Sequence, residues 1–340
     1  MAEPRLDLTR TQILAYRRKV QALDERLPPG LDSLRTVAWA GLQDSMPRAA
    51  LLSIHARVKG VEPSTWEDSS LVQLWGPRFS AYVVAARDRA AFSLGRLPEG
   101  GKSLQVAVEI AARLRAFLDG KTLTYGEAGE GLGVHPNRLR YAAPTGTVLI
   151  RWDGARQPTI WTAPPPDVDP REARLELARR YVHVFGPTTG ASFARWAGIG
   201  PREGPAAFDA LGESLMRVRT PVGDGSILTS DEPMLRAPAR PTTAVRLLPS
   251  GDTYFLLQGA DRELLVPNAD RRPLLWTSRV WPGAVLVDGE IVGTWRRAEG
   301  DVTIQPWRRL TRRERDALAR EAASLPLPGL RGRILVHWDA

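Results

Sequence analysis

The sequence predicts an α+β protein. Tandem winged-helix modules, each a helix-turn-helix with a β-hairpin wing, precede a small C-terminal β-barrel-like domain. Two patterns lead to this prediction. Helical segments followed by a hairpin recur three times along the chain, and short strand runs replace the helices from residue 244 onward. With 340 residues, the chain exceeds the usual size of one domain, so several cores are expected.

The first module is expected over residues 1–98. Thr9 is a suitable cap for a helix over residues 11–20, and a second helix is expected over residues 34–42. Residues 71–85 resemble two short strands around a Gly-Pro turn. A third helix follows the polar elbow described next, which completes the element order of a winged helix.

The elbow is Gln43-Asp44-Ser45, between the second and third helices of this module. Asp44 or Ser45 can cap the third helix, and Pro47 fits its first turn because no backbone N–H is needed there. Gln43 is then held beside a positive helix end that attracts phosphate, water or carboxylate. The elbow suits DNA binding or chemistry on DNA, and an ordinary capped turn is the alternative explanation.

The second module is expected over residues 99–166. An amphipathic helix is followed by two short helices, and the second of these covers residues 134–141. Residues 147–161 then read as a hairpin, because Asp153-Gly154 is a turn signal flanked by alternating apolar residues. This order repeats that of the first module.

The rest of the sequence divides at a stiff run of three prolines that ends at residue 166. Residues 167–240 are expected to form a third module, with a long helix over residues 171–185 and a wing turning at residues 223–225. Residues 241–340 carry strand runs, one of them beginning at Tyr254, and are expected to form the β-domain.

The composition favours a nucleic-acid partner. Lys and Arg number 47 against 38 Asp and Glu, giving a net charge of +9, and nearly all of the basic residues are Arg, whose planar fork matches phosphate. A GC-rich coding sequence is the alternative cause of this enrichment. The absence of Cys excludes disulfides and thiolate metal sites, and the scattering of four His predicts no zinc site. We expect no membrane partner, a cytoplasmic, nucleoid-associated location and a monomer.

Basic and polar residues near the elbow, on the wings and on the short helix of the second module are candidate DNA contacts. A solvated polar helix face is the alternative for the residues of the short helix, and a core Trp295 with solvated arginines is the alternative for Arg296 and Arg297. The candidates are Arg48, Arg78, His135, Asn137, Arg138, Arg140, Arg151, Arg156, Arg296 and Arg297.

A series of short motifs, taken in order, resembles the AlkZ-like winged-helix DNA glycosylases. The series begins with Gly-Leu-Gln43-Asp44-Ser45-x-Pro-Arg-Ala-Ala-Leu-Leu-x-x-x-Ala-Arg57 and Leu-Trp-Gly-Pro-Arg78. It continues with Arg-Trp-Asp-Gly154, Phe-Gly-Pro-Thr188-x-x-x-x-Phe-Ala-Arg-Trp196, Arg-Leu-Leu-Pro249-x-x-Asp252 and Leu-Val-Asp-Gly289-x-x-Val-Gly-x-Trp295. The resemblance covers nearly the whole sequence and rests on the order of the motifs.

The resemblance implies a bacterial DNA-repair enzyme that forms a C shape around duplex DNA. Such an enzyme hydrolyses the N-glycosidic bond of N7-alkylated purines, in some members including interstrand crosslinks, with no metal or diffusible cofactor. The family's catalytic motif is Gln-x-Gln or Gln-x-Asp. Gln43 matches its first position, Ser45 stands at the second, and Asp44 lies between them. These three are the candidate catalytic residues.

Because the second motif position differs, two other functions stay open at this point. One is a non-catalytic winged-helix DNA-binding protein, acting as a regulator or damage sensor. The other is a scaffold of winged helices that binds protein. Excision of an alkylated base separates the enzyme from both alternatives, and DNA binding at low salt separates the sensor from the scaffold.

Overall fold

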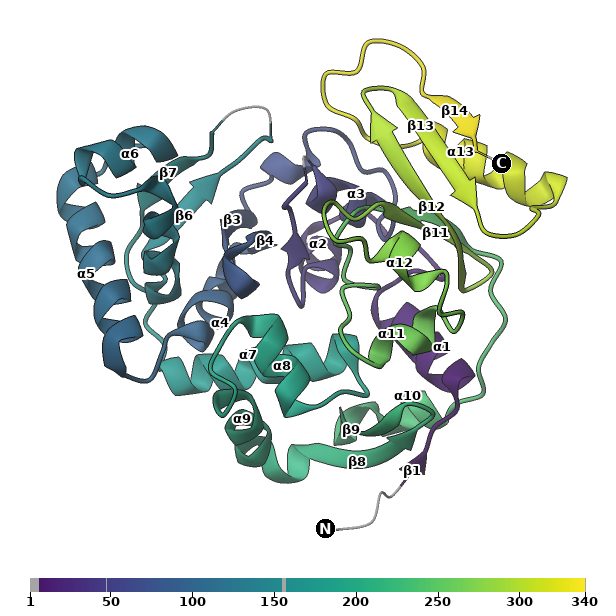
Figure 1. Ribbon diagram of the computed structural model, residues 1–340, viewed down its shortest axis with the longest axis horizontal. Helices are drawn as coiled ribbons and strands as arrows, with labels where there is room; N and C mark the ends of the chain where they lie inside the picture. Colours follow the sequence, from purple (N-terminus) through teal and green to yellow (C-terminus); the bar gives the residue numbers. More distant parts are fainter. Residues whose placement is uncertain (1–5, 47, 155–156, 340) are drawn as a thin grey trace.

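A computed structural model describes residues 6–46, 48–154 and 157–339, and it is an α+β fold (Figure 1). The predicted α+β class is confirmed. Pro47 and Arg156, two residues of the sequence predictions, lie outside the described residues. Three separate sheets organise the described residues, and helices pack around them.

A six-stranded sheet lies at the centre of the N-terminal half, in the order β2-β4-β3-β6-β7-β5. The two predicted wings, β3–β4 and β6–β7, meet in this sheet where Gln73 of β3 pairs with Ile150 of β6. The first two modules therefore share one sheet across the expected boundary at residue 98. The strands are β2 Leu42–Gln43, β3 Leu71–Trp75, β4 Ala81–Ala85, β5 Leu123–Thr124, β6 Val148–Arg151 and β7 Thr159–Thr162.

The helices of this half largely follow the sequence prediction. Thr9 caps α1 with a reciprocal capping box, as expected. The predicted helix over residues 34–42 is wrong at its end, because Gly41 adopts a φ of 72° and the next two residues pair with β4. The predicted helix over residues 134–141 is a 3₁₀ helix, η5 Pro136–Thr145. The other bounds are α1 Arg10–Val20, α2 Leu31–Val37, α3 Ala49–His55, α4 Arg89–Ser93, α5 Gly101–Leu118 and α6 Tyr125–Gly131.

The third unit carries an aromatic core and a three-stranded sheet. Tyr181 stacks on Phe185 with ring centroids 4.9 Å apart, and Trp196 packs against both rings. The N-terminal strand β1 pairs in parallel with β8, so the start of the chain joins this unit. The elements are β1 Leu6–Asp7, α7 Pro170–Phe185, α8 Gly190–Ala197, α9 Glu203–Leu211, β8 Leu215–Thr220, β9 Gly223–Leu228 and α10 Glu232–Arg236.

The C-terminal sheet is open, which corrects the predicted barrel-like domain. Its order is β10-β11-β12-β13-β14, and its first and last strands do not pair with each other. The strand expected from Tyr254 is also wrong: that buried segment has no ladder partner, and the carbonyl of Phe255 accepts from the indole of Trp276. The elements are β10 Val245–Leu248, α11 Asp261–Leu265, α12 Arg272–Leu275, β11 Gly283–Val287, β12 Glu290–Ala298, β13 Asp301–Pro306, α13 Arg312–Ala323 and β14 Leu335–Trp338.

The C-terminal sheet packs against α3, a helix of the N-terminal half. Leu52 of α3 belongs to the same buried cluster as Val285 of β11 and Leu318 of α13. Arg26 forms two hydrogen bonds to Glu321 of α13, at 2.6 and 2.8 Å, and a third to the carbonyl of His55. The lobe of α5 and α6 and the C-terminal sheet consequently lie on opposite sides of α2 and α3 (Figure 1).

Candidate active site

The elbow leads from β2 into α3. Gln43 is paired with Tyr82 in β4, and the backbone N–H of Asp44 donates to the carbonyl of Ala81. The Asp44 carboxylate accepts from the N–H of Ala50 at 2.9 Å, in the first turn of α3. The N-cap position itself is held by Arg48, so the predicted N-cap at Asp44 or Ser45 is wrong. Asp44 instead reaches the helix start from outside it and satisfies one of the free N–H groups there.

Asp44 also ties the elbow to the second wing. Its other carboxylate oxygen accepts from the amide nitrogen of Gln73 at 2.7 Å, and the Gln73 carbonyl accepts from the N–H of Trp152 at 2.6 Å. The Asp44 residue is only 2% exposed. Each carboxylate oxygen of Asp44 accepts a hydrogen bond from a protein group, so Asp44 holds the elbow in place from its buried side.

Gln43 is the half-buried amide of the elbow. Its side-chain nitrogen donates to the hydroxyl of exposed Ser45 at 3.1 Å, whereas its carbonyl oxygen is buried without a protein partner among the described residues. A buried amide oxygen normally accepts a hydrogen bond. Because Ser45 accepts from the amide nitrogen, the carbonyl oxygen is the acceptor of the Gln43 side chain that stays without a partner among the described residues.

The loop after β10 covers the Gln43 amide. Gly251 adopts a φ of 74°, and a Cβ on this residue would stand 3.2 Å from the amide carbon of Gln43. Only glycine combines this backbone conformation with such a close approach. The loop thus forms one wall of the Gln43 site.

A buried ion pair holds that loop against α3. Arg57 donates to both oxygens of Asp252 at 2.7 Å, and the two side chains are 1% and 0% exposed. The hydroxyl of Ser53 adds a third hydrogen bond to Asp252, also at 2.7 Å. Because Asp252 immediately follows Gly251, this network sets the position of the wall beside Gln43.

Two of the predicted DNA contacts converge on one aromatic ring. The guanidinium carbons of Arg48 and Arg151 lie 3.6 and 3.3 Å from the ring centre of Trp66, which is 6% exposed. Burial lowers the pKa of both arginines, and the charges of Asp44 and Glu67 partly offset this effect. The structure thereby joins the elbow and the second wing through a residue that sequence reasoning missed.

The other predicted contacts are spread over the molecule. His135 is the N-cap of η5, and Asn137, Arg138 and Arg140 lie within it; η5 packs against α5 and α6. Arg78 is half-buried against Gly198 at the end of α8. Arg296 and Arg297 are exposed on β12 and line a cleft that Met46, next to the elbow, also lines. Arg296 and Arg297 thus share a cleft with a neighbour of the elbow, whereas the residues at η5 lie on a separate lobe.

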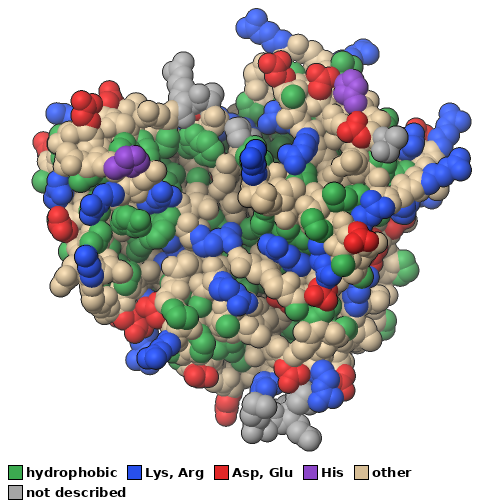
Figure 2. Space-filling view, in the orientation of Figure 1, with side chains coloured by type: hydrophobic (Ala, Val, Ile, Leu, Met, Phe, Trp, Pro, Cys, Tyr) green, Lys and Arg blue, Asp and Glu red, His purple; other side chains and the backbone are tan. Residues whose placement is uncertain are grey.

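Basic side chains cross the middle of the face in Figure 2, and acidic side chains lie mostly toward its edges. The surface is hollowed between the lobe of α5 and α6 and the C-terminal sheet. Such a distribution attracts a polyanion to the middle of the face.

The family model described as "DNA glycosylase AlkZ-like" matches residues 37–326 of the protein. The protein belongs to the AlkZ-like DNA glycosylase family. This membership confirms the resemblance, and it favours a DNA-repair glycosylase over a regulator or a scaffold.

A comparison of sequences and a comparison of structures support the AlkZ-like assignment. An interstrand DNA cross-link repair glycosylase of Streptomyces sahachiroi is 23% identical over 92% of this chain and 94% of its own length. The structure of the S. sahachiroi DNA glycosylase AlkZ is similar with a TM-score of 0.78 at 20% identity, and it covers 98% of this chain and all of that one. The overall fold of the AlkZ-like protein is therefore shared with AlkZ.

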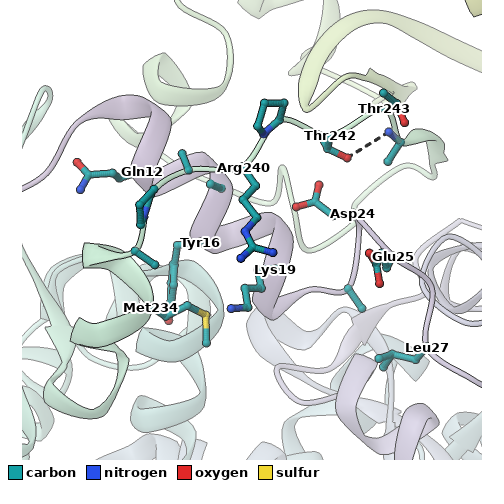
Figure 3. A pocket seen from close by; sticks show the side chains of 17 residues that line it. Gln12, Tyr16, Lys19, Asp24, Glu25, Leu27, Met234, Arg240, Thr242 and Thr243 are labelled. Atoms are coloured by element: carbon teal, nitrogen blue, oxygen red, sulfur yellow. Dashed lines mark hydrogen bonds between the residues drawn. The ribbon is translucent and has the colours of Figure 1, made fainter.

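One cavity of the AlkZ-like protein lies apart from the elbow. It measures about 790 Å³ between α1 and the extended segment 237–244, and Arg240 and Lys19 both line it (Figure 3). Asp24 and Glu25 line it as well, so its charges are mixed. It shares no lining residue with the elbow. In the part of the chain that the structure describes, no helix is long and apolar enough to cross a membrane.

The elbow of the AlkZ-like protein is expected to make stability depend on pH. Burial raises the pKa of Asp44 from 3.8 to about 6, against the opposing hydrogen bond from Ala50. The folded state therefore binds this proton more tightly than the unfolded state, and the Asp44 contribution to stability is lost as the pH rises from about 4 through 6. A shift of this size corresponds to about 3 kcal/mol.

The measurement is urea unfolding of the wild type and of Asp44→Asn at pH 4, 5, 6 and 7. The stability of the wild type relative to Asp44→Asn is expected to fall over this range, because only the wild type ionises at this position. The comparison at each pH cancels other groups, including His55, whose pKa burial lowers to about 4. A constant difference between the two proteins refutes the assignment.

Proposed function

We propose that the protein is a monofunctional DNA glycosylase that hydrolyses the N-glycosidic bond of N7-alkylated purines, interstrand crosslinks included. Family membership supplies the reaction class. The proposal is assigned to this site because the carbonyl oxygen of Gln43 is buried beside a helix start and has no partner in the described part of the chain.

An N7-alkylated purine already carries a positive charge, so it leaves readily as a neutral base. What remains for the protein is to hold water near C1′ and to stabilise a cationic sugar. Gln43 accepts from that water through its carbonyl oxygen, and Ser45 orients the amide by accepting from its nitrogen at 3.1 Å. Preorganised dipoles of this kind contribute several kcal/mol to barrier lowering.

Asp44 supports Gln43 from the buried side. It accepts hydrogen bonds from the N–H of Ala50 in α3 and from the amide of Gln73, so the elbow keeps its geometry when DNA binds. Above pH 6 its carboxylate is mainly ionised, and a negative charge behind the elbow favours a cationic sugar in front of it. In this proposal Asp44 positions the elbow and supplies a negative charge behind it. Gln43 and Ser45 are the residues that contact the substrate.

In this proposal the DNA lies across the hollowed basic face, and the protein forms a C shape around it. Arg48, Arg151 and the β12 arginines contact phosphates near the lesion, and the η5 residues together with Arg78 and Arg156 contact the flanking duplex. The protein acts as a monomer in the bacterial cytoplasm, on the nucleoid. Water and protein groups suffice for the reaction, so no metal or diffusible cofactor takes part.

The test is incubation of the purified protein with duplex DNA containing N7-methylguanine, followed by chromatography of free bases and of DNA strands. The proposal predicts free N7-methylguanine and an abasic but uncut strand. Release at the spontaneous depurination rate, by protein that is folded and bound to the duplex, refutes the activity.

Arg48 and Arg151 are expected to bind phosphate from their stacked positions on Trp66. Each alanine substitution should weaken duplex binding about equally for all sequences and reduce the slope of log K against log salt by about 1. Fluorescence anisotropy from 50 to 200 mM salt measures both quantities. Arg236→Ala is the matched control, because this arginine is exposed on α10 and pairs with Glu232 at 2.7 Å. An unchanged slope in both the Arg48→Ala and the Arg151→Ala protein contradicts the phosphate contacts.

A further inference from the structure

A small cleft opens immediately beside the elbow. It has a volume of about 170 Å³ and lies between the start of α3, the loop after β10 and strand β12. Ala49 and Leu52 of α3 form one wall, and Val280 and Trp281 form the opposite one. Ser250 also lines the cleft, and the next residue, Gly251, covers the Gln43 amide, so the cleft and the Gln43 site share one loop.

We infer that, in a monoadduct, where only one purine carries the alkyl group, this cleft receives the neutral, apolar substituent at N7, up to the size of one aromatic ring. The inference rests on the proposed function and adds the class of adduct that the site selects. N7 is one carbon away from N9, the atom whose bond to C1′ breaks. A group attached at N7 is therefore within reach of a cleft that adjoins Gln43.

The size of the cleft fits this occupant. A protein cavity of about 150 Å³ lined by apolar side chains holds benzene. The present cleft is of similar volume, and most of its lining is apolar. A methyl group fills a small part of this space, whereas a benzyl group fills most of it and buries more apolar surface.

The charges beside the cleft determine whether it prefers a neutral or a charged substituent. Arg296 and Arg297 line the cleft and are exposed on β12, and Arg296 donates to the carbonyl of Val280 at 3.3 Å. Two guanidinium groups beside the cleft disfavour a substituent that carries its own positive charge. The cleft therefore selects neutral rings over aminoalkyl groups.

The opposite wall is held by its own contacts. The Trp281 indole donates to the carbonyl of Thr277 at 3.0 Å, and the guanidinium of Arg262 lies 5.4 Å from the Trp281 ring centre. Trp295 lies within β12 and also lines the cleft, and its indole N–H donates to the carbonyl of Leu248 at 2.8 Å. Both indole N–H groups are thus satisfied within the protein, which leaves aromatic surface for the substituent.

The experiment compares single-turnover release of N7-methylguanine, N7-benzylguanine and N7-(2-aminoethyl)guanine from the same duplex. Each rate is corrected for spontaneous depurination. At a protein concentration that half-saturates the benzyl duplex, we expect the release rate of N7-benzylguanine to exceed the release rates of the other two bases at least tenfold. Ala49→Leu and Val280→Trp fill the cleft from opposite walls and should lower the benzyl-to-methyl ratio about tenfold. Val108→Trp, at an exposed position of α5, should leave the ratio unchanged.

Binding of wild-type protein to duplexes with 2′-fluoro sugars, which resist base loss, tests the inference without any variant. The benzyl duplex is expected to bind about tenfold more tightly than the methyl duplex. Release of N7-methylguanine with equal binding of the two duplexes overturns the inference alone. An unchanged benzyl-to-methyl release ratio in both Ala49→Leu and Val280→Trp also overturns the inference alone. Failure to release any of the three bases overturns the proposed function instead.

Discussion

Replacing Gln43 by alanine is expected to abolish base excision while leaving DNA binding and folding intact. The glutamine amide makes one hydrogen bond to Ser45 and holds a carbonyl oxygen without a protein partner among the described residues, so little of the fold depends on it. Loss of one preorganised group of this kind typically lowers kcat about 10²- to 10³-fold. Single-turnover release of N7-methylguanine measures the effect.

Gln258→Ala is the matched control for this variant. Gln258 is a half-buried glutamine that lines a different cavity, near α8. Its replacement should leave the excision rate within about twofold of the wild type. A Gln43→Ala protein that retains wild-type excision removes Gln43 from the mechanism.

Arg57→Met is expected to destabilise the protein by about 3–5 kcal/mol, the usual effect of leaving one buried charge unpaired. Methionine fills the space of the arginine stem, but Asp252 then lies buried without its cation. The wall at Gly251 is expected to loosen over Gln43, so kcat should fall even in the fraction that stays folded. Urea unfolding and excision kinetics measure the two effects.

Two further proteins separate the buried charge from general damage. Arg113→Met breaks an exposed pair with Glu109, whose side chains are 43% and 64% exposed, and should change stability by less than about 1 kcal/mol. The double variant Arg57→Met/Asp252→Leu should recover much of the lost stability, because neither charge remains buried. Equal stability of Arg57→Met and the wild type contradicts the importance of this network.

The local signals of the sequence predicted much of the fold. Capping residues such as Thr9 and turn signals such as Gly76-Pro77 act over a few residues, and the elements that they bound are present. The helix expected up to residue 42 ends early, since tertiary packing around Gly41 against Tyr82 and Phe92 decides its course. Pairing between β3 and β6 is a long-range contact that no local pattern encodes.

The candidate site was predictable in its elbow and not in its surroundings. The order of motifs placed Gln43 at the centre, but the N-cap of α3 was predicted at Asp44 or Ser45 and lies at Arg48, because the course of the backbone into α3 depends on the fold. The role of Trp66 was missed, because a lone tryptophan near a turn gives no sign that two arginines stack on it. Arg57 and Asp252 stand in separate motifs, and only the fold brings them together.

A crystal structure with duplex DNA that carries a cationic pyrrolidine in place of the damaged sugar tests the central claim most directly. This ring mimics the charge of the sugar in the transition state. We predict that the Gln43 carbonyl oxygen lies within hydrogen-bond reach of the ring position equivalent to C1′, directly or through one water. A pyrrolidine bound away from the elbow, with that oxygen turned from the DNA, would contradict the account.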